Sequence, residues 1–284
     1  MRVLVTGATG FIGDHVVQVL QKRKKIELLV TSKSRKKASK YSWFESVEYI
    51  EQDLNEKRND FFQLFGKPEC LIHLAWEGLP NYTELFHFEQ NLPNNYFFLK
   101  DMIQSGLKKL VVTGTCAEYG LQNGCLSEEC SAIPSNAYGI AKDTLRRILE
   151  VLTKKYTFDF QWIRLFYIYG EVHKEGSIFD QLDSALMQGN ETFQMSNGEQ
   201  LRDYLDVKQA AEYIVKIMCQ NSINGIINCC SGKPISVRKL IENYLKAKGK
   251  TIQLDLGFYS LPDYEPLALW GDITKLNRIL ESYE

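Results

Sequence analysis

The stretch Thr6-Gly7-Ala8-Thr9-Gly10-Phe11-Ile12-Gly13 decides the fold, because it joins an apolar, strand-like run to a segment with helical periodicity. Its first glycine permits a tight turn, its second lets the backbone approach a pyrophosphate, and its third allows the helix to pack closely on the strand. The N-terminus of that helix offers unpaired N–H groups and a partial positive charge to phosphates. We therefore predict a dinucleotide site with these contact residues: Gly7, Thr9, Gly10, Phe11, Ile12 and Gly13.

Strand-like and helical patterns alternate through the first 170 residues. Strands are predicted at residues 3–6, 26–31, 47–52, 70–75, 110–113 and 160–167. Helices are predicted at residues 14–22, 90–105 and 141–156. This alternation predicts an α/β fold with a doubly wound parallel sheet and helices on both of its faces.

The pattern loosens beyond residue 170. Helices are predicted at residues 177–188, 206–219 and 236–246, and a strand is predicted at residues 225–230. We expect residues 1–169 to form a dinucleotide-binding domain, to which residues 203–230 return. Residues 170–202 and 231–284 would form a smaller substrate-binding lobe.

The composition argues against several classes of protein. A formal net charge of −1 over 284 residues gives no broad electrostatic reason to bind nucleic acid or an anionic membrane. No stretch approaches about 18 uncharged apolar residues and no secretory pattern opens the sequence, so we expect neither a membrane span nor a signal peptide. Seven cysteines, without paired Cys-x-x-Cys spacing, argue against a disulfide framework and a zinc site. We therefore expect a metal-free protein of the reducing cytoplasm.

Tyr138 and Lys142 stand four residues apart, so on a helix they would lie on one face. An ammonium group beside a phenol favours the phenolate and would lower the pKa of Tyr138 toward neutrality. A tyrosine tuned in this way can pass a proton to or from a carbonyl or alcohol oxygen. The pair thus indicates acid–base chemistry next to a dinucleotide site.

The Gly-x-x-Gly-x-x-Gly spacing and the Tyr-x-x-x-Lys pair together resemble the extended short-chain dehydrogenase/reductase family, and within it the enzymes that modify nucleotide-activated sugars. The resemblance covers nearly the whole chain and implies a Rossmann-type fold. In that family a serine or threonine stands four residues before the tyrosine of a Tyr-Gly pair, here Tyr119-Gly120, and this selects Thr115. The resemblance therefore implies a catalytic triad of Thr115, Tyr138 and Lys142.

The resemblance also implies cofactor contacts where the predicted third, fourth and fifth strands end. Asp53 would contact the adenine, Lys142 would also bind the nicotinamide ribose, and Asn91 would support the active-site region. His73 is more typical of a core histidine than of a catalyst, so we assign it no proton transfer. The implied cofactor set is Asp53, Leu54, Leu74, Ala75, Trp76, Asn91, Thr113, Tyr138 and Lys142.

Substrate contacts are implied by two further segments. Arg202 matches the arginine that pairs with the diphosphate of the sugar nucleotide, a task that suits a planar guanidinium. An ion pair between Arg202 and a neighbouring carboxylate is the alternative. Tyr167 replaces the asparagine of the family's Arg-x-x-Asn-x-Tyr-Gly strand, and Ser177 would border the nucleotide base. The implied substrate set is Thr115, Cys116, Tyr138, Tyr167, Ser177 and Arg202.

The residues after the second predicted strand bear on the choice of cofactor. NAD-binding proteins usually carry an acidic residue there, which binds the 2′-hydroxyl of the ribose. In this chain a 2′-phosphate would instead meet Ser32, Lys33 and Arg35. We therefore predict NADP(H), with NAD(H) as the alternative.

The residues after Thr115 reduce the number of reactions that the family resemblance allows. The family's 4,6-dehydratases carry Asp-Glu there, but this chain has Cys116-Ala117, which argues against dehydration. Cys116 and His173 each stand one position away from the Cys and His that the GDP-fucose synthase branch uses for epimerisation. We therefore interpret both as structural or substrate-lining residues.

Three interpretations of function follow. The first is NADPH-dependent reduction of the C4 keto group of a nucleotide-activated 4-keto-6-deoxyhexose, for deoxysugar or surface polysaccharide biosynthesis. The second is an NAD-dependent C4 epimerase of a UDP-sugar. The third is a non-catalytic regulator that senses the cofactor, which the retained triad and Asn91 disfavour. By analogy with the family we also expect a homodimer that assembles through helices 90–105 and 141–156.

Overall fold

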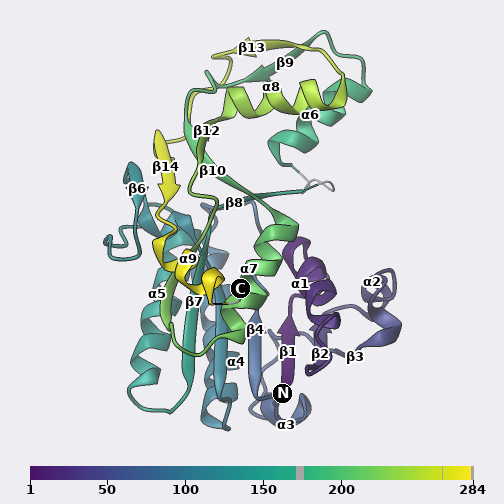
Figure 1. Ribbon diagram of the computed structural model, residues 1–284, viewed down its shortest axis with the longest axis vertical. Coiled ribbons are helices and arrows are strands. Elements are labelled where there is room, and N and C mark those ends of the chain that lie inside the picture. The colour runs from purple at the N-terminus through teal and green to yellow at the C-terminus, as the bar shows by residue number, and fades with distance from the viewer. Residues whose placement is uncertain (171–175, 264, 283–284) are drawn as a thin grey trace.

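The computed structural model describes residues 1–170, 176–263 and 265–282. Its largest sheet has seven strands in the order β11-β7-β5-β4-β1-β2-β3, and all neighbouring strands run parallel. The predicted α/β fold with a doubly wound parallel sheet is confirmed (Figure 1). The strands are β1 (Arg2–Thr6), β2 (Glu27–Ser32), β3 (Glu48–Glu51), β4 (Cys70–His73), β5 (Lys109–Thr115), β7 (Asp159–Leu165) and β11 (Gly225–Cys229).

Helices cover both faces of this sheet. Successive side chains of a strand point to opposite faces, and Val3 and Val5 of β1 pack in one hydrophobic cluster while Leu4 packs in the other. The first cluster includes α1 (Phe11–Gln21), α2 (Arg35–Ala38), α7 (Val207–Cys219) and α9 (Thr274–Glu281). The second includes α3 (Phe61–Leu64), α4 (Leu92–Gln104) and α5 (Ala137–Thr153).

A smaller group of elements stands beyond the carboxyl ends of the strands, at the top of Figure 1. There α6 (Ile178–Met187) and α8 (Val237–Lys248) pack against the parallel pair β9 (Thr192–Met195) and β13 (Gln253–Leu256). A second sheet links this group to the rest, in the order β12-β10-β14-β6 with β8 beside β10. Its strands are β6 (Gly124–Leu126), β8 (Tyr167–Tyr169), β10 (Leu201–Asp206), β12 (Pro234–Ser236) and β14 (Ala268–Gly271). The division into two domains at residue 170 stays a prediction.

Several predicted boundaries shift in the structure. The helix predicted at residues 141–156 begins at Ala137, so both Tyr138 and Lys142 lie within α5. The strand predicted at residues 160–167 ends at Leu165, and the chain then forms β8 beside β10. The helix predicted at residues 90–105 is divided into the π-helical turn η2 (His87–Asn91) and α4. The short 3₁₀ segments are η1 (Phe44–Ser46) and η3 (Cys116–Tyr119).

Two further expectations concern disulfides and membrane spans. All seven cysteines are free thiols. Among the residues that the structure describes, no helix combines the length and the apolar character that a membrane span needs.

Candidate active site

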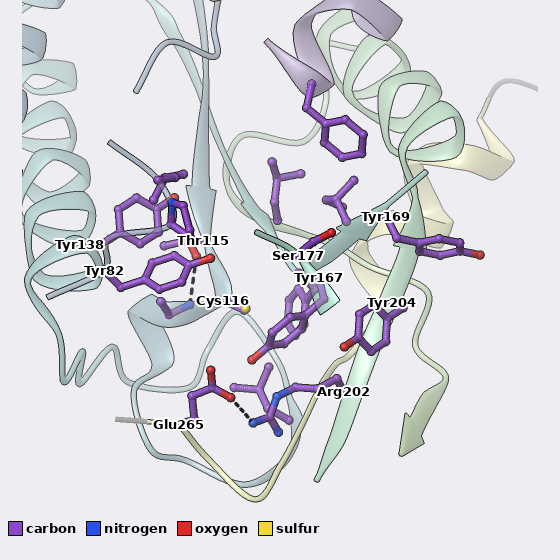
Figure 2. Close-up of a pocket in the computed structure, with 18 of the residues that line it drawn as sticks. Tyr82, Thr115, Cys116, Tyr138, Tyr167, Tyr169, Ser177, Arg202, Tyr204 and Glu265 are labelled. Atoms are coloured by element: carbon purple, nitrogen blue, oxygen red, sulfur yellow. Dashed lines mark hydrogen bonds and ion pairs between the residues drawn. The ribbon is translucent and has the colours of Figure 1, made fainter. Parts of the chain in front are cut away.

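A cavity of about 530 Å³ opens at the carboxyl ends of β5 and β7, between the large sheet and the smaller group of elements. Ligands of doubly wound sheets bind at this end of the strands. Figure 2 shows Thr115, Tyr138 and Tyr82 on one side of the cavity, with Tyr167, Tyr204 and Arg202 across from them. The predicted residues that line it are Phe11, Ile12, Leu74, Trp76, Thr113, Thr115, Cys116, Tyr138, Lys142, Tyr167, Ser177 and Arg202.

The glycine loop lies beside this cavity and is shaped by close packing. Gly7 has a φ of +71°, and a Cβ atom there would lie 2.8 Å from the backbone nitrogen of Ala75. A Cβ at Gly13 would lie 2.1 Å from the carbonyl oxygen of Gly7, so the start of α1 can approach the loop only with glycine there. Gly10 is the N-cap of α1, and no side chain caps that helix end. The N-terminal N–H groups of α1 therefore suit the pyrophosphate of a dinucleotide.

Tyr138 lies in the first turn of α5, and Thr115 ends β5. Burial raises the pKa of the Tyr138 phenol well above its ordinary value, the neighbouring Tyr82 adds to this rise, and a hydrogen bond with Thr115 opposes it. The prediction that Lys142 lowers this pKa toward neutrality is therefore wrong in this structure, because the loss of hydration dominates. At neutral pH the phenol keeps its proton, as a proton donor requires.

Lys142 is buried and reaches the carboxyl end of β5. Its Nζ donates a hydrogen bond to the carbonyl oxygen of Thr113 at 2.9 Å and lies 4.1 Å from the centre of the Trp76 ring. Burial lowers the pKa of Lys142 to about 7, and the charge of Glu118 opposes this shift. The ammonium thus has a fixed place at the predicted cofactor end of the cavity.

The segment after β4 is held by a small polar network. Trp76 donates from Nε1 to His87 Nδ1 at 3.1 Å, and Asn91 donates from Nδ2 to the carbonyl oxygen of Glu77 at 3.0 Å. Asn91 thus ties η2 to the segment after β4, and its supporting role in the active site stays a prediction. The His73 ring forms hydrogen bonds with the side chains of Thr6 and Asn95. Burial lowers the pKa of His73 to about 3, which is typical of a neutral structural histidine.

Lys33 and Arg35, the two cations predicted to bind a 2′-phosphate, already have partners within the protein. Lys33 forms ion pairs with Asp53 and Glu77. The guanidinium of Arg35 lies 4.9 Å from the centre of the Tyr49 ring, and its backbone N–H donates to Glu51 at 2.7 Å.

The neighbouring predicted contacts also have partners. Ser32 shares a 3.0 Å hydrogen bond with the Tyr49 hydroxyl. Asp53 accepts a hydrogen bond from the Asn55 backbone in a turn, and Leu54 packs at the edge of the core.

The predicted diphosphate ligand, Arg202, is 1% exposed. Its Nη2 atom donates to Glu265 at 2.7 Å, and its guanidinium lies 5.4 Å from the Tyr167 ring centre. The ion pair with a carboxylate, our alternative for Arg202, is thus present, on the wall of the cavity. Ser177 caps α6 by accepting a hydrogen bond from Asp180 at 3.3 Å.

Cys116 lines the cavity with a thiol whose pKa burial raises to about 12. A neutral thiol is a poor nucleophile and base, which agrees with the structural or substrate-lining interpretation of Cys116. His173 lies outside the described residues.

Sequence reasoning missed several residues of the cavity wall. Tyr82 and Glu265 come from irregular segments that carry no motif, and Glu265 is 63 positions from its partner Arg202. Tyr204 stands two positions after Arg202 on the same strand, so this spacing was the available signal.

A sequence model described as the NAD dependent epimerase/dehydratase family matches residues 3–230. The chain belongs to this family. Two curated relatives show its range. The chain is 31% identical to dTDP-6-deoxy-L-talose 4-dehydrogenase (NAD(+)) of Aggregatibacter actinomycetemcomitans, over 95% of this chain and 99% of the relative. It is 26% identical to UDP-arabinose 4-epimerase 1 of Arabidopsis thaliana, over 98% of this chain and 74% of the relative.

A solved member of the family has the same fold. The UDP-glucuronic acid 4-epimerase of Bacillus cereus, in complex with UDP-glucuronic acid and NAD, superposes with a TM-score of 0.85. The match covers 99% of this chain and 93% of that one, at 23% sequence identity. At this identity the likeness supports the shared fold, and the chemistry has to be argued from the residues of the cavity.

Proposed function

We propose that the chain uses NAD(H) to exchange a hydride with C4 of a nucleotide-activated hexose. The observation that carries this proposal is the meeting of Thr115, Tyr138 and Lys142 at one cavity beside the glycine loop. Loss of the tyrosine or the lysine would be expected in a non-catalytic cofactor sensor. The names of the two relatives, a 4-dehydrogenase and a 4-epimerase, support C4 as the reacting carbon.

Each triad residue has a distinct task in this proposal. Bound NAD(H) would supply or accept the hydride. Tyr138 would donate its hydroxyl proton to the C4 oxygen when C4 is reduced, and its phenolate would take the proton of the C4 hydroxyl when C4 is oxidised. Thr115 would hydrogen-bond the same oxygen and fix its distance to the phenol. Lys142 would bind the nicotinamide ribose and, as a cation, would favour the Tyr138 phenolate that takes this proton.

Epimerisation at C4 is the outcome that we place first. It uses the triad twice, once to oxidise C4 and once to reduce the resulting ketone on its other face. Relatives named as 4-epimerases of UDP-sugars support it, and they support it better than net reduction with NADPH, our first interpretation of the sequence.

Net oxidation or reduction at C4 of a 6-deoxyhexose is the second candidate. One specific observation favours it. The relative with 31% identity is named as a 4-dehydrogenase of a dTDP-linked 6-deoxysugar, and the chain covers 99% of its length. The chain covers only 74% of the UDP-arabinose 4-epimerase.

For the cofactor we propose NAD(H), in place of the NADP(H) predicted from the sequence. Ser32 ends β2 and is paired in register with Glu51 at the end of β3. Glu51 can therefore supply from the neighbouring strand the carboxylate that the second strand lacks. Because Lys33 is paired with two carboxylates, a 2′-phosphate would meet net negative charge here.

We also propose a homodimer that assembles through α4 and α5. Phe97 on α4 and Val151 on α5 are 61% and 62% exposed, although both are large and apolar. The two helices contact each other along one side of the large sheet, so a second copy could cover both. A cytoplasmic location stays a prediction.

A substrate panel tests the proposed function. The purified protein would be incubated with UDP-glucose, UDP-arabinose and dTDP-linked 6-deoxy and 4-keto-6-deoxy sugars, with NAD+ or NADH. Epimerisation gives a product with inverted C4 in the NMR spectrum and no net change in nicotinamide absorbance. Net dehydrogenation or reduction changes that absorbance in proportion to product. No conversion of any sugar would refute the proposal.

A further inference from the structure

Glu118 is a buried carboxylate directly behind Thr115. It lies in η3 with an exposed fraction of 0%. Its Oε1 atom accepts a hydrogen bond from the backbone N–H of Thr115 at 2.9 Å, and Thr115 Oγ1 accepts one from the backbone N–H of Ala117 at 3.2 Å. Thr115 and Glu118 also form a capping box, in which the Thr115 side chain accepts from the backbone N–H of Glu118. These contacts hold Thr115 by its backbone and by its side chain at once.

Strand β7 fixes the same carboxylate from the other side. Trp162 donates from Nε1 to both Glu118 oxygens at 2.9 and 3.1 Å, and Arg164 donates from Nε at 2.8 Å. Arg146 of α5 lies 3.9 Å away. Burial raises the pKa of Glu118, and the charge of Arg164 opposes this rise. Since these partners are all donors, the geometry suits an ionised carboxylate.

Gly114 leaves the space that this arrangement needs. A Cβ atom at Gly114 would lie 2.1 Å from Trp162 Nε1 and 2.4 Å from Glu118 Oε1. Backbone atoms of β5 can therefore approach the carboxylate only because no side chain stands at that position. The backbone at Gly114 and Thr115 therefore packs directly against the Glu118 carboxylate.

We propose that Glu118 is a positioning residue, which acts through its hydrogen bond to the backbone of Thr115 and sets the place of the Thr115 hydroxyl opposite Tyr138. The inference rests on the proposed function, because it gives Thr115 its task at the C4 oxygen. With the Thr115 oxygen already accepting from Ala117, the hydroxyl proton is left to be directed toward the cavity. A displacement of about 1 Å in such a group can lower a rate by about 100-fold.

A pair of double variants isolates the hydrogen bond from the buried charge. Removing Glu118 alone would leave Arg164 buried and unpaired, which is strongly destabilising. Both variants therefore replace the arginine as well: E118Q/R164M keeps an acceptor for the Thr115 N–H, and E118L/R164M does not. Thermal unfolding confirms that each variant is folded before its kinetics are compared.

Turnover is the first readout. We expect kcat of E118L/R164M to fall by about 100-fold with the KM for the sugar nucleotide within about threefold, and the glutamine variant to recover most of the loss. In a Thr115→Ala background the leucine and glutamine variants should have equal kcat, because the loss acts through Thr115. Equal kcat in the two double variants would overturn the inference. So would a difference in kcat between the leucine and glutamine variants that is as large in the Thr115→Ala background as with Thr115 present.

Hydrogen exchange of the Thr115 amide is the second readout, and it needs no substrate. The amide should exchange at least about 10-fold more slowly in E118Q/R164M than in E118L/R164M, because only the first keeps its acceptor. Equal exchange rates would refute the positioning contact. If the wild-type protein converted no sugar nucleotide, the proposed function would fail, whereas the exchange rates would still decide whether Glu118 holds Thr115.

Discussion

The ammonium nitrogen of Lys142 lies 4.1 Å from the centre of the Trp76 ring. A cation over an aromatic face is stabilised by about 0.5–2 kcal/mol, which offsets only part of the cost of burying a charge. The carbonyl oxygen of Thr113 adds one hydrogen bond. The site therefore holds Lys142 in place at a cost to the folded state, and this has a measurable consequence.

Lys142→Met should stabilise the protein in a pH-dependent way. The pKa of Lys142 is about 7 in the folded protein against an ordinary value of 10.5, so between these two pH values the unfolded chain binds more protons. The stability of the wild type therefore falls as the pH decreases from 10.5 to 7. Without added nucleotide, the Tm of the variant minus that of the wild type should grow as the pH decreases from 10.5 to 7, and it should level off at lower pH. A difference that did not depend on pH would contradict this account.

Tyr138→Phe removes the proton donor and leaves the ring. We expect kcat to fall by about 100-fold or more, because general acid–base catalysis contributes about 10²–10⁴-fold. The Kd for NAD+ should stay within a few-fold, since the glycine loop and α1 are untouched. Steady-state kinetics and calorimetric titration of NAD+ measure the two effects separately. Undiminished turnover would remove Tyr138 from the mechanism.

The sequence predicted those parts of the site that depend on local patterns. The turn at Gly7 and the Tyr138/Lys142 pair each depend on residues within a few positions of one another. Local spacing is enough to place the turn and to put the pair on one face of a helix, although the helix predicted from residue 141 begins at Ala137. The same holds for the alternation of strands and helices that predicted the large sheet.

The features of the site that could not be predicted depend on contacts between segments that are distant in the sequence. No pattern near Arg202 indicates Glu265, which is 63 positions away, and no pattern near Lys142 shows that it turns to Trp76. Burial raises the pKa of Tyr138, and burial is a property of the folded chain. The short strand β14 was missed because its partner β6 lies far away in the sequence.

Arg202→Leu tests the predicted diphosphate contact. If the guanidinium exchanges Glu265 for the diphosphate, loss of the guanidinium should raise the KM for the sugar nucleotide by about 10–100-fold. This factor corresponds to the free energy of one hydrogen bond to a charged group, about 1.5–3 kcal/mol. The kcat should change much less, because Arg202 is remote from the proton donor in this proposal. Arg238→Leu is the control, since Arg238 is an exposed arginine of α8 that pairs with Glu242. An unchanged KM in Arg202→Leu would leave the residue with a structural role only.

Phe97→Glu tests the proposed dimer. A carboxylate at the centre of an apolar interface would be buried without a partner, so we expect the dimer to dissociate. Light scattering after size-exclusion chromatography measures the mass. Met187→Glu is the control, because Met187 is an apolar side chain that is 87% exposed but lies on α6, away from α4 and α5. A wild-type monomer, or equal effects of the two substitutions, would refute the interface.

Glu51→Gln tests the choice of cofactor. Glu51 lies beside Ser32, where the 2′-position of the ribose would be bound, and its charge would repel a 2′-phosphate. We expect the wild type to bind NADH more tightly than NADPH in calorimetric titration, and Glu51→Gln to reduce this ratio of affinities by about 10-fold, which corresponds to about 1.4 kcal/mol. Glu48→Gln is the matched control, because Glu48 starts the same strand and pairs with Arg2 at the opposite end of the sheet. A wild type that prefers NADPH would restore the prediction made from Lys33 and Arg35.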